Sequence, residues 1–319
     1  MNKKKTIFFT SGFGFLGGGL ASFFSEKDFK IILGTREKRD SPAWCKGAEI
    51  ISIDWNNLQS LSDILKKTDV VIHTAGMNAT DCNNNPSGAI YFNGLITHKL
   101  VKLCKKIGVK KFIFFSSAHV YRNKLRGYID ESTLPTNNHP YAISKIAAEN
   151  NILNIKDNKF YYVIFRLSNV IGLPMEKNMN CWSLFTNDIP RQAVINGKIF
   201  IKGNGEDQRD LITMKNLYEI LITYIDDKIS FPKIINIAGG NTYKVIEIAK
   251  IISEYHKSIT GNECKIFLKN KINEEKNESL QYVSKYNFFN ITSKKDIFET
   301  IYKIYDFCKK IEINHLASK

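Results

Sequence analysis

A tyrosine and a lysine four residues apart, Tyr141 and Lys145, follow a serine pair, Ser116 and Ser117. On a helix, two residues at this spacing lie one turn apart on the same face. A phenol has a pKa of about 10, and lowering that pKa to about 7 takes roughly 4 kcal/mol of preferential stabilisation of the phenolate. A nearby ammonium can supply part of this stabilisation.

Together these residues suit one type of reaction, in which a proton moves at an alcohol or carbonyl oxygen as a hydride leaves or arrives. The serine hydroxyl would hold the substrate oxygen while the tyrosine takes or gives the proton. A tyrosine and a lysine at this spacing also occur by chance in lysine-rich chains, as a half-exposed helix pair. The elements around the motif must therefore decide between the two readings.

The composition is that of a soluble globular protein large enough for two lobes, with 319 residues, 43% hydrophobic and 24% charged. The formal net charge is +15, but the lysines are scattered and no basic helix or nucleic-acid-binding motif is present. We expect no nucleic-acid partner and only a general attraction for an anionic small substrate. The cysteines show neither a C-x-x-C pair nor metal-ligand spacing, so we expect reduced thiols and no metal.

The N-terminal stretch could be mistaken for a signal peptide, because three lysines precede an apolar run over residues 6–24. Glycines interrupt this run at 12, 14, 17, 18 and 19 and make it a poor apolar helix but a good strand, turn and helix. No later stretch approaches 18 uninterrupted apolar residues. We therefore expect no signal peptide, no membrane span and a cytoplasmic location.

A glycine-rich turn follows the first apolar run. Residues 6–10 have the pattern of a buried parallel strand, and Gly12, Gly14 and Gly17 then form G-x-G-x-x-G around Phe15 and Leu16, at the start of a helix reaching about residue 27. Such glycines allow a tight turn and let a pyrophosphate approach the helix N-terminus. In this context the motif predicts a dinucleotide site, and the alternative is a flexible loop.

The second predicted strand, residues 30–33, ends in Gly34, Thr35 and Arg36. A site for NAD usually has an acidic residue here, bonded to the ribose 2′-hydroxyl. None is present, whereas Arg36 can meet a 2′-phosphate with Thr35 as a further donor. We therefore favour NADP(H) over NAD(H), with a plain surface arginine as the alternative.

Further apolar runs at residues 50–53, 69–73, 111–115, 160–165 and 234–238 alternate with helical spacing, most clearly over 89–108, where Gly108 is a plausible C-cap. This alternation predicts an α/β fold with a doubly wound parallel sheet of the Rossmann type. We expect an NAD(P)-binding domain over 1–172 and a smaller C-terminal substrate-binding lobe over 173–319, with a segment near 211–245 returning to the sheet.

Taken together, the motifs resemble the extended short-chain dehydrogenase/reductases, the nucleotide-sugar epimerase/dehydratase group. The matching segments occur in the same order as in that group: the glycine turn at 12–17, Asp54, His73 to Gly76, Asn93-Gly94, Ser116 to Tyr121, Tyr141 to Lys145, Arg166 to Gly172, and Arg209-Asp210. The resemblance runs from Thr6 to at least Gly240.

The resemblance implies a role for each of these positions. Tyr141 would be the acid/base, Lys145 its partner and a ribose ligand, and Ser117 the residue that holds the substrate oxygen. The remaining cofactor contacts would come from Asp54, Trp55, Thr74, Ala75, Gly76, Asn93 and Ser116. The nucleotide diphosphate of a sugar would be held by Asn169, Asn187 and Arg209, and His119 could touch the sugar.

The chain departs from the 4,6-dehydratases at one informative place. Where those enzymes carry an Asp-Glu pair after the catalytic hydroxyl residue, this chain has Ala118 and His119. The resemblance therefore implies an NADP(H)-dependent reductase of a nucleotide-linked 4-keto sugar, working as a homodimer through the helices around 89–108 and 141–156. The alternatives are a nucleotide-sugar 4-epimerase that retains NAD, an enzyme of steroid- or flavonoid-like ketones, and a non-catalytic NADP-binding regulator.

Overall fold

The structure is a computed structural model that describes residues 4–156, 159–226, 231–270, 278–286 and 292–317. The chain divides into two compact units. The first comprises Met1–Asn123, Glu131–Leu167 and Tyr218–Ile237. The second comprises Lys124–Asp130, Ser168–Leu217 and Ala238–Lys319. Each unit is described by itself below.

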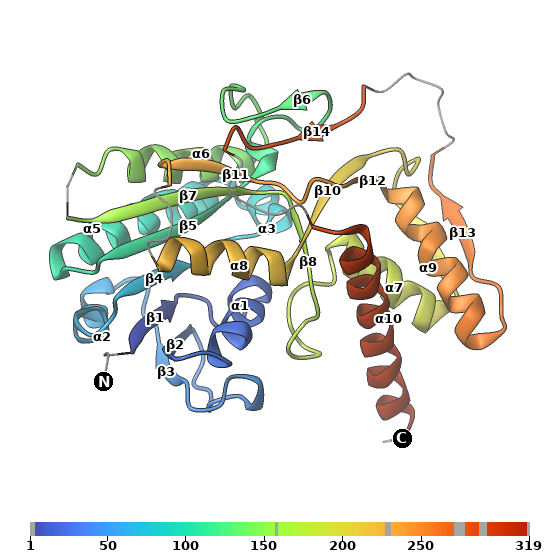
Figure 1. Cartoon of the computed structure of the whole chain (residues 1–319), viewed down its shortest axis with the longest axis horizontal. Helices are drawn as coiled ribbons and strands as arrows, with labels where there is room; N and C mark the ends of the chain where they lie inside the picture. The colour runs from blue at the N-terminus through green and yellow to red at the C-terminus, as the bar shows by residue number, and fades with distance from the viewer. Residues whose placement is uncertain (1–3, 157–158, 227–230, 271–277, 287–291, 318–319) are drawn as a thin grey trace. The chain divides into compact units, whose positions relative to one another are not determined.

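The first unit is built on a parallel sheet, which among the described residues has seven strands in the order β11-β7-β5-β4-β1-β2-β3 (Figure 1). This order reverses between β1 and β4, which makes their carboxyl ends the switch point where such folds bind ligands. The sheet confirms the predicted doubly wound α/β fold. Its strands are β1 (Lys5–Phe9), β2 (Phe29–Thr35), β3 (Glu49–Ser52), β4 (Val70–His73), β5 (Lys111–Ser117), β7 (Tyr161–Leu167) and β11 (Ile234–Ile237).

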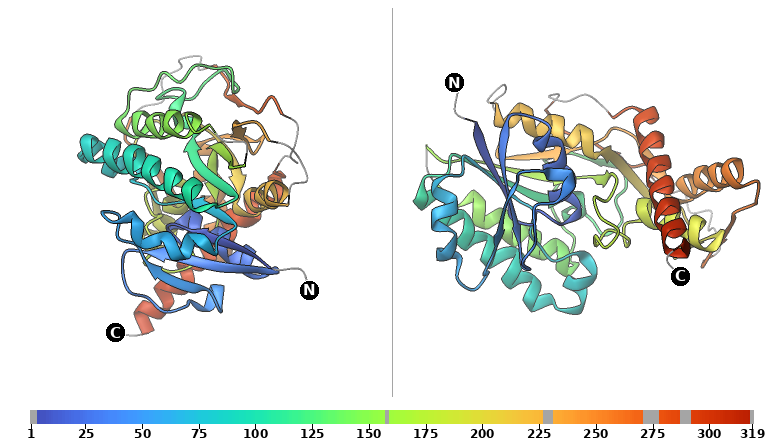
Figure 2. Two further views of the ribbon diagram at one scale, coloured as in Figure 1. Left: turned by 90° about the vertical axis from the view of Figure 1, so that its left-hand side faces the viewer. Right: turned by 90° about the horizontal axis from the view of Figure 1, so that it is seen from below.

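The strands form at the apolar runs, as predicted. Helices cover both faces of the sheet, so the side chains on both faces of its central strands β4 and β5 are buried. Every residue of β5 is buried, and Phe112 and Phe114 belong to the core cluster beneath one layer of helices. That layer includes α2 (Ser62–Lys66), α5 (Thr97–Ile107) and α6 (Pro140–Leu153). The helices α1 (Phe15–Ser25) and α8 (Met214–Ile225) lie on the other face, where the ring of Tyr218 packs 4.9 Å from that of Phe24 (Figure 2).

The predicted helix over 89–108 is not one regular helix. It begins in α4 (Pro86–Ala89), passes through a π-helical segment, η3 (Ile90–Ile96), and continues as α5 to a left-handed C-cap at Gly108, with φ 96°. The π-helical segment carries Asn93, so the widened turn coincides with one of the predicted cofactor residues. Short elements complete the unit: α3 (Ala79–Asn84), η1 (Ala43–Cys45), η2 (Leu58–Leu61) and η4 (Ala118–Val120).

The second unit holds small sheets packed with helices. In the part of this unit that the structure describes, one sheet has three strands in the order β12-β10-β8, β9 pairs with β13, and β6 pairs with β14. Its strands are β6 (Tyr128–Ile129), β8 (Asn169–Ile171), β9 (Lys198–Ile201), β10 (Gln208–Thr213), β12 (Thr242–Lys244), β13 (Lys265–Leu268) and β14 (Gln281–Tyr282). Its helices are α7 (Phe185–Asn196), α9 (Val245–Thr260) and α10 (Lys294–Ala317), which share an apolar core with β9 and β10.

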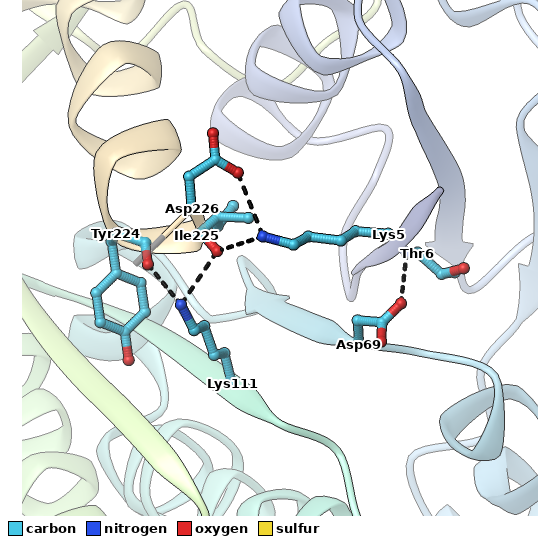
Figure 3. Close-up of polar contacts among 7 residues, drawn as sticks. All are labelled: Lys5, Thr6, Asp69, Lys111, Tyr224, Ile225 and Asp226. Atoms are coloured by element: carbon cyan, nitrogen blue, oxygen red, sulfur yellow. Dashed lines mark hydrogen bonds and ion pairs between the residues drawn. The ribbon is translucent and has the colours of Figure 1, made fainter. Parts of the chain in front are cut away.

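Two lysines at the N-terminal edge of the large sheet hold the C-terminal end of α8. Lys111 donates to the carbonyl oxygens of Tyr224 and Ile225 at 2.7 and 3.1 Å, and Lys5 donates to that of Ile225 at 2.9 Å (Figure 3). The last carbonyls of a helix have no partner inside the helix and carry partial negative charge, so ammonium groups suit them. The two lysines thus fix α8 to strands β1 and β5, at the edge of the sheet opposite the carboxyl ends.

Replacing Lys111 by methionine should lower the free energy of unfolding by about 1.5–3 kcal/mol, because a buried charged donor to two carbonyls is lost. Lys110 offers a matched control. Its side chain is 74% exposed and, among the described residues, forms a surface ion pair with Asp69, so Lys110→Met should change stability by less than about 0.5 kcal/mol. Urea unfolding measures the free energy of unfolding of each variant. Equal losses in the two variants would contradict the role of Lys111 in holding the end of α8.

Candidate functional site

The first unit brings the three predicted catalytic residues together. Tyr141 and Lys145 lie on α6, and Ser117 ends β5, where its side chain hydrogen-bonds Tyr141. The Nζ of Lys145 lies 5.7 Å from the centre of the Tyr141 ring. The start of α6 is well defined, because Pro140 occupies its first turn and His139 Nδ1 accepts the N–H of Tyr141 at 3.1 Å. The structure thus places the three side chains in one region, and their catalytic roles stay a prediction.

The electrostatics of the pair differ from the sequence expectation. Burial raises the pKa of Tyr141 to about 12, and the hydrogen bond with Ser117 opposes this rise. Burial also lowers the pKa of Lys145 to about 8, against the opposing effects of Cys82 and Glu149. Desolvation of the phenolate is the largest cause, so in this structure the pKa of Tyr141 lies above its ordinary value rather than below it. At neutral pH Tyr141 is a protonated phenol.

Lys145 is held in place from two sides. Its Nζ donates to the carbonyl oxygen of Phe115 at 2.9 Å and lies 4.9 Å above the ring of Phe114. One turn further along α6, Glu149 makes a buried bidentate ion pair with Arg166 of β7, at 3.0 and 2.6 Å. Arg166 also donates to the hydroxyl of Tyr121 at 2.9 Å. Sequence reasoning missed Glu149, although its spacing of four residues from Lys145 places both on one face.

A buried histidine organises the switch point between β1 and β4. The N–H groups of Thr74 and Ala75 both donate to Thr10 Oγ1 at 3.1 Å, which uses both lone pairs of that hydroxyl. The Thr10 hydroxyl must then donate its own proton to His73 Nδ1, 2.9 Å away. His73 Nε2 consequently carries the ring proton and donates to Thr97 Oγ1 at 3.0 Å. The geometry thus assigns the Nε2–H tautomer.

The predicted glycine turn has the close contacts that a dinucleotide-binding turn requires. A Cβ on Gly17 would lie 1.9 Å from the carbonyl oxygen of Ser11, and one on Gly12 would lie 2.5 Å from Leu33 Cβ. Neither position therefore accepts a side chain. No side chain caps the start of α1 at Gly14, and the first-turn N–H groups there suit a pyrophosphate. The buried hydroxyl of Ser116 also lacks a hydrogen-bond partner among the described residues. These features fit NAD(P).

The predicted adenosine contacts lie at the ends of β2 and β3. Arg36 is exposed at the end of β2, and Thr35 Oγ1 accepts the N–H of Glu37 at 3.1 Å. Asp54 is exposed and accepts the N–H of Asn56 at 2.9 Å. Trp55 is half-buried and packs edge-on against Phe92, with ring centres 5.2 Å apart. Much of the Trp55 ring is therefore engaged by the core.

Asn93 holds the loop after β4 against the catalytic helix. Its Oδ1 accepts the N–H of Met77 at 2.8 Å, and its Nδ2 donates to Ser144 Oγ at 2.9 Å. Ser144 in turn donates to the carbonyl oxygen of Tyr141 at 2.8 Å. The side chain of Asn93 is thus used within the protein, and it contributes by positioning the loop that carries Gly76. Ser144 was not singled out from the sequence.

The predicted substrate residues fall in both units. In the first, His119 is half-buried, and its N–H donates to Ser117 Oγ at 3.2 Å. In the second, Asn169 donates to the carbonyl oxygen of Asp210 at 3.2 Å, and Arg209 lies 3.7 Å from Asp207. Asn187 is fully buried and bonds to Thr186 and Cys181 inside its own unit. Their contacts with a substrate stay a prediction.

Asp210 was noted in the sequence only as a neighbour of Arg209, but it anchors the turn after residue 238. Its Oδ1 accepts the N–H of Gly239 at 2.7 Å. Burial raises the pKa of this carboxyl to about 6, while the backbone hydrogen bonds it accepts favour the charged form. Asp210 therefore positions β10, which carries Arg209.

Metal-ligating clusters, disulfides and membrane-spanning helices are all absent from the described residues. Within the described residues there is no group of three or more potential metal-ligating side chains. All six cysteines are buried and outside any disulfide. No described helix is long and apolar enough to cross a membrane.

The comparisons with known proteins identify the family. The sequence model of the NAD dependent epimerase/dehydratase family matches residues 7–238. The chain belongs to this family, and it is an enzyme of the NAD(P)-dependent kind that modifies nucleotide-linked sugars.

Known relatives differ in the reaction that they catalyse. The dTDP-D-glucose 4,6-dehydratase of Mus musculus is 28% identical over 259 residues, covering 77% of this chain and 71% of that protein. The UDP-glucose 4-epimerase of Mycoplasma genitalium is 26% identical over 277 residues, covering 77% of this chain and 81% of that protein. The fold matches RMD from Pseudomonas aeruginosa complexed with NADPH, with a TM-score of 0.74 and 19% identity over 96% of this chain and 99% of that one.

The hydrogen bonds of His73 give a testable prediction. Burial and the charge of Lys145 lower the pKa of His73 to about 3, so the folded protein keeps this ring neutral down to that pH. The unfolded chain takes up a proton below about pH 6.5, so this residue makes stability fall as the pH drops from about 6.5 toward 3. His73→Gln should be less stable at pH 7.5 and should show a shallower loss of stability with acid. Urea unfolding at several pH values measures both effects.

Nitrogen-15 NMR of the histidine ring checks the tautomer in the same experiment. We expect a neutral ring with its proton on Nε2, unchanged between pH 7.5 and 5. A signal from Nδ1–H, or from a ring that becomes charged near pH 6.5, would contradict the assigned network.

Proposed function

We propose that the protein is an NADP(H)-dependent reductase of a nucleotide-linked 4-keto sugar. The observation that carries this proposal is the end of β2, where Thr35 and Arg36 stand in place of the carboxylate that a ribose 2′-hydroxyl would need. An exposed guanidinium there suits a 2′-phosphate. Cells commonly use NADPH as a reductant, so a site shaped for its phosphate supports a reducing reaction.

The catalytic residues support the same direction. When bound, the nicotinamide would supply the hydride. Ser117 would hold the carbonyl oxygen of the keto sugar, and Tyr141 would give its phenolic proton to the developing alkoxide. A tyrosine with a raised pKa is protonated at neutral pH, which is the form that reduction requires. Lys145 would add positive charge beside the phenolate as it forms.

The residues after Ser117 argue against water elimination. Ala118 is buried and apolar, and His119 is half-buried, so neither supplies the carboxylate pair that the resemblance associates with 4,6-dehydratases.

A nucleotide-sugar 4-epimerase is the second candidate, supported by the similarity to the Mycoplasma genitalium epimerase. An epimerase oxidises and reduces the same carbon and consumes no cofactor, whereas a reductase consumes NADPH stoichiometrically. The purified protein should oxidise NADPH when given an NDP-4-keto sugar and should leave UDP-, GDP- and dTDP-sugars unchanged when no cofactor is added. NADPH oxidation is followed by the loss of NADPH absorbance, and the sugar products of both incubations are identified by NMR.

Tyr141→Phe is the control for this assay. It removes the transferable proton and keeps the ring, so kcat should fall by at least ~10²-fold while the cofactor still binds. Near-normal turnover would remove Tyr141 from the mechanism. Exchange of epimers without added cofactor would instead select the epimerase.

Cofactor choice can be tested separately at Arg36. Arg36→Ala should weaken NADP(H) binding far more than NAD(H) binding, since only the first carries a 2′-phosphate. Arg39→Ala is a matched control, because this neighbouring arginine pairs with Glu37 and lies over the Phe13 ring. Fluorescence titration of both cofactors measures the effect, and equal weakening by Arg36→Ala would make Arg36 a surface residue.

An exposed apolar face supports the homodimer. Ile90, Tyr91 and Leu95 of the π-helical segment and Ile143 of α6 are each more than 40% exposed, and these two elements pack together. Two copies could bury this face against each other. Sedimentation of wild type against Leu95→Lys measures the association, and a monomeric wild type would exclude it.

A further inference from the structure

Two strands of the second unit carry nearly the same five residues. The first runs Lys198-Ile199-Phe200-Ile201-Lys202 and the second Lys265-Ile266-Phe267-Leu268-Lys269. They lie side by side as the parallel pair β9 and β13, with Lys265 opposite Lys198 and Phe267 opposite Phe200. The ladder continues beyond the strands, where the N–H of Lys269 donates to the carbonyl oxygen of Ile201 at 3.0 Å.

The alternation of side chains gives this small sheet two unlike faces. The four aliphatic residues form one face, which packs into the core of the unit against α7, α9 and α10. The lysines and phenylalanines therefore share the other face, and all six are exposed. We call them the Lys-Phe face: Lys198, Phe200, Lys202, Lys265, Phe267 and Lys269.

At the centre of the Lys-Phe face the two phenylalanine rings stack on each other. Their centres are 5.1 Å apart and their planes differ by 16°, while Phe200 remains 54% and Phe267 42% exposed. Each strand advances about 3.3 Å per residue, so a pair of lysines stands about 7 Å from the rings on either side. A short aromatic stack thus lies between two pairs of positive charges.

The four lysines of this face differ from Lys244 of the same unit. Among the described residues, none of the four ammonium groups has a hydrogen bond or an ion pair, whereas Lys244 pairs closely with Glu206. Neither five-residue pattern contains an acidic residue. The Lys-Phe face therefore has uncompensated positive charge around flat apolar rings, which is complementary to a ligand with negative charges and flat faces of its own.

The edge of β9 is closed to another strand at its centre. Gln192 of α7 accepts the N–H of Phe200 at 2.7 Å and donates to its carbonyl oxygen at 3.3 Å. Both backbone groups that an added strand would need there are already used. At this edge a ligand cannot extend the sheet from Phe200, whereas the Lys-Phe face itself stays exposed.

From these observations we propose that the Lys-Phe face binds single-stranded nucleic acid, independently of the sugar-nucleotide site. Unpaired bases would extend the stack begun by Phe200 and Phe267, and phosphates would lie against the lysines. This combination of aromatic stacking and positive charge is how proteins hold single strands without sequence preference. We expected no nucleic-acid partner from the sequence because the two patterns are far apart in the chain and come together only through the β9–β13 pairing.

Binding can be measured with a fluorescein-labelled U12 oligonucleotide by anisotropy, on the full chain with NADP⁺ and UDP in excess so that the sugar-nucleotide site is filled. Four lysine–phosphate contacts should give a slope of about −3 for log affinity against log salt concentration. Lys202→Gln with Lys269→Gln should reduce that slope by about half. Lys30→Gln with Lys46→Gln removes the same charge from exposed lysines of the first unit and should leave the slope unchanged.

The aromatic contribution is tested by Phe200→Ala with Phe267→Ala, which should weaken U12 by about 5-fold to 150-fold for each stacked base. An abasic 12-mer should bind the wild type no better than U12 binds this variant. Circular dichroism establishes that each variant is folded, and a misfolded double variant is replaced by Phe267→Ser alone.

Three results would overturn the proposal. The first is no binding of U12 at 50 mM salt and 100 μM protein. The second is equal loss in the Lys30 and Lys46 control, which would make the attraction a general effect of net charge. The third is a pair of observations: the Lys-Phe variants bind U12 as well as the wild type does, but they no longer bind vesicles that contain anionic phospholipid. This result would assign the face to a membrane surface.

Discussion

Buried charge on the inner face of α6 is the constraint on which the rest of the first unit depends. Lys145, Glu149 and Arg166 are all buried, and an isolated charge in such a place costs several kcal/mol. The bidentate pair of Glu149 with Arg166 satisfies two of them, and the carbonyl of Phe115 accepts from the third. Because these contacts need α6, β5 and β7 in one arrangement, the helix cannot shift without leaving a charge unpaired.

This arrangement has a consequence for the chemistry. A rigid α6 holds Tyr141 in the same register as Lys145, and β5 delivers Ser117 to the phenol. The widened turn at Asn93 ties α6 to the loop after β4 through Ser144, and His73 ties that loop to β1 through Thr10. The predicted acid, its charged neighbour and the glycine turn are thus connected by hydrogen bonds between buried or partly buried groups, which are worth more in a low dielectric than in water.

Most of the first unit could be predicted from the sequence, because its signals are local. Apolar runs such as 111–115 gave strands within one or two residues, and Gly108 ended a helix as expected. The π-helical segment at 90–96 was missed, because nothing in its spacing of apolar residues differs from an ordinary helix. The raised pKa of Tyr141 was missed for another reason: its main cause is burial, which is a property of the packed structure and not of the local sequence. Two pairings were missed for the same reason, because only the fold brings their members together: Glu149 with Arg166, and β9 with β13.

The same physical limit explains why the reaction is harder to infer than the family. A serine, a tyrosine and a lysine in contact serve any reaction in which hydride leaves or reaches a carbon bearing oxygen, so they cannot separate a reductase from an epimerase or a dehydratase. Selectivity must come from the groups beside them. At residues 118 and 119 this chain lacks the two carboxylates that the resemblance associates with 4,6-dehydratases. At residues 35 and 36 it lacks the carboxylate typical of an NAD site and has an arginine instead. Each missing carboxylate removes a base or a hydroxyl ligand, and the added arginine supplies a phosphate ligand. These four positions therefore bear more on the reaction than the geometry of the serine, tyrosine and lysine does.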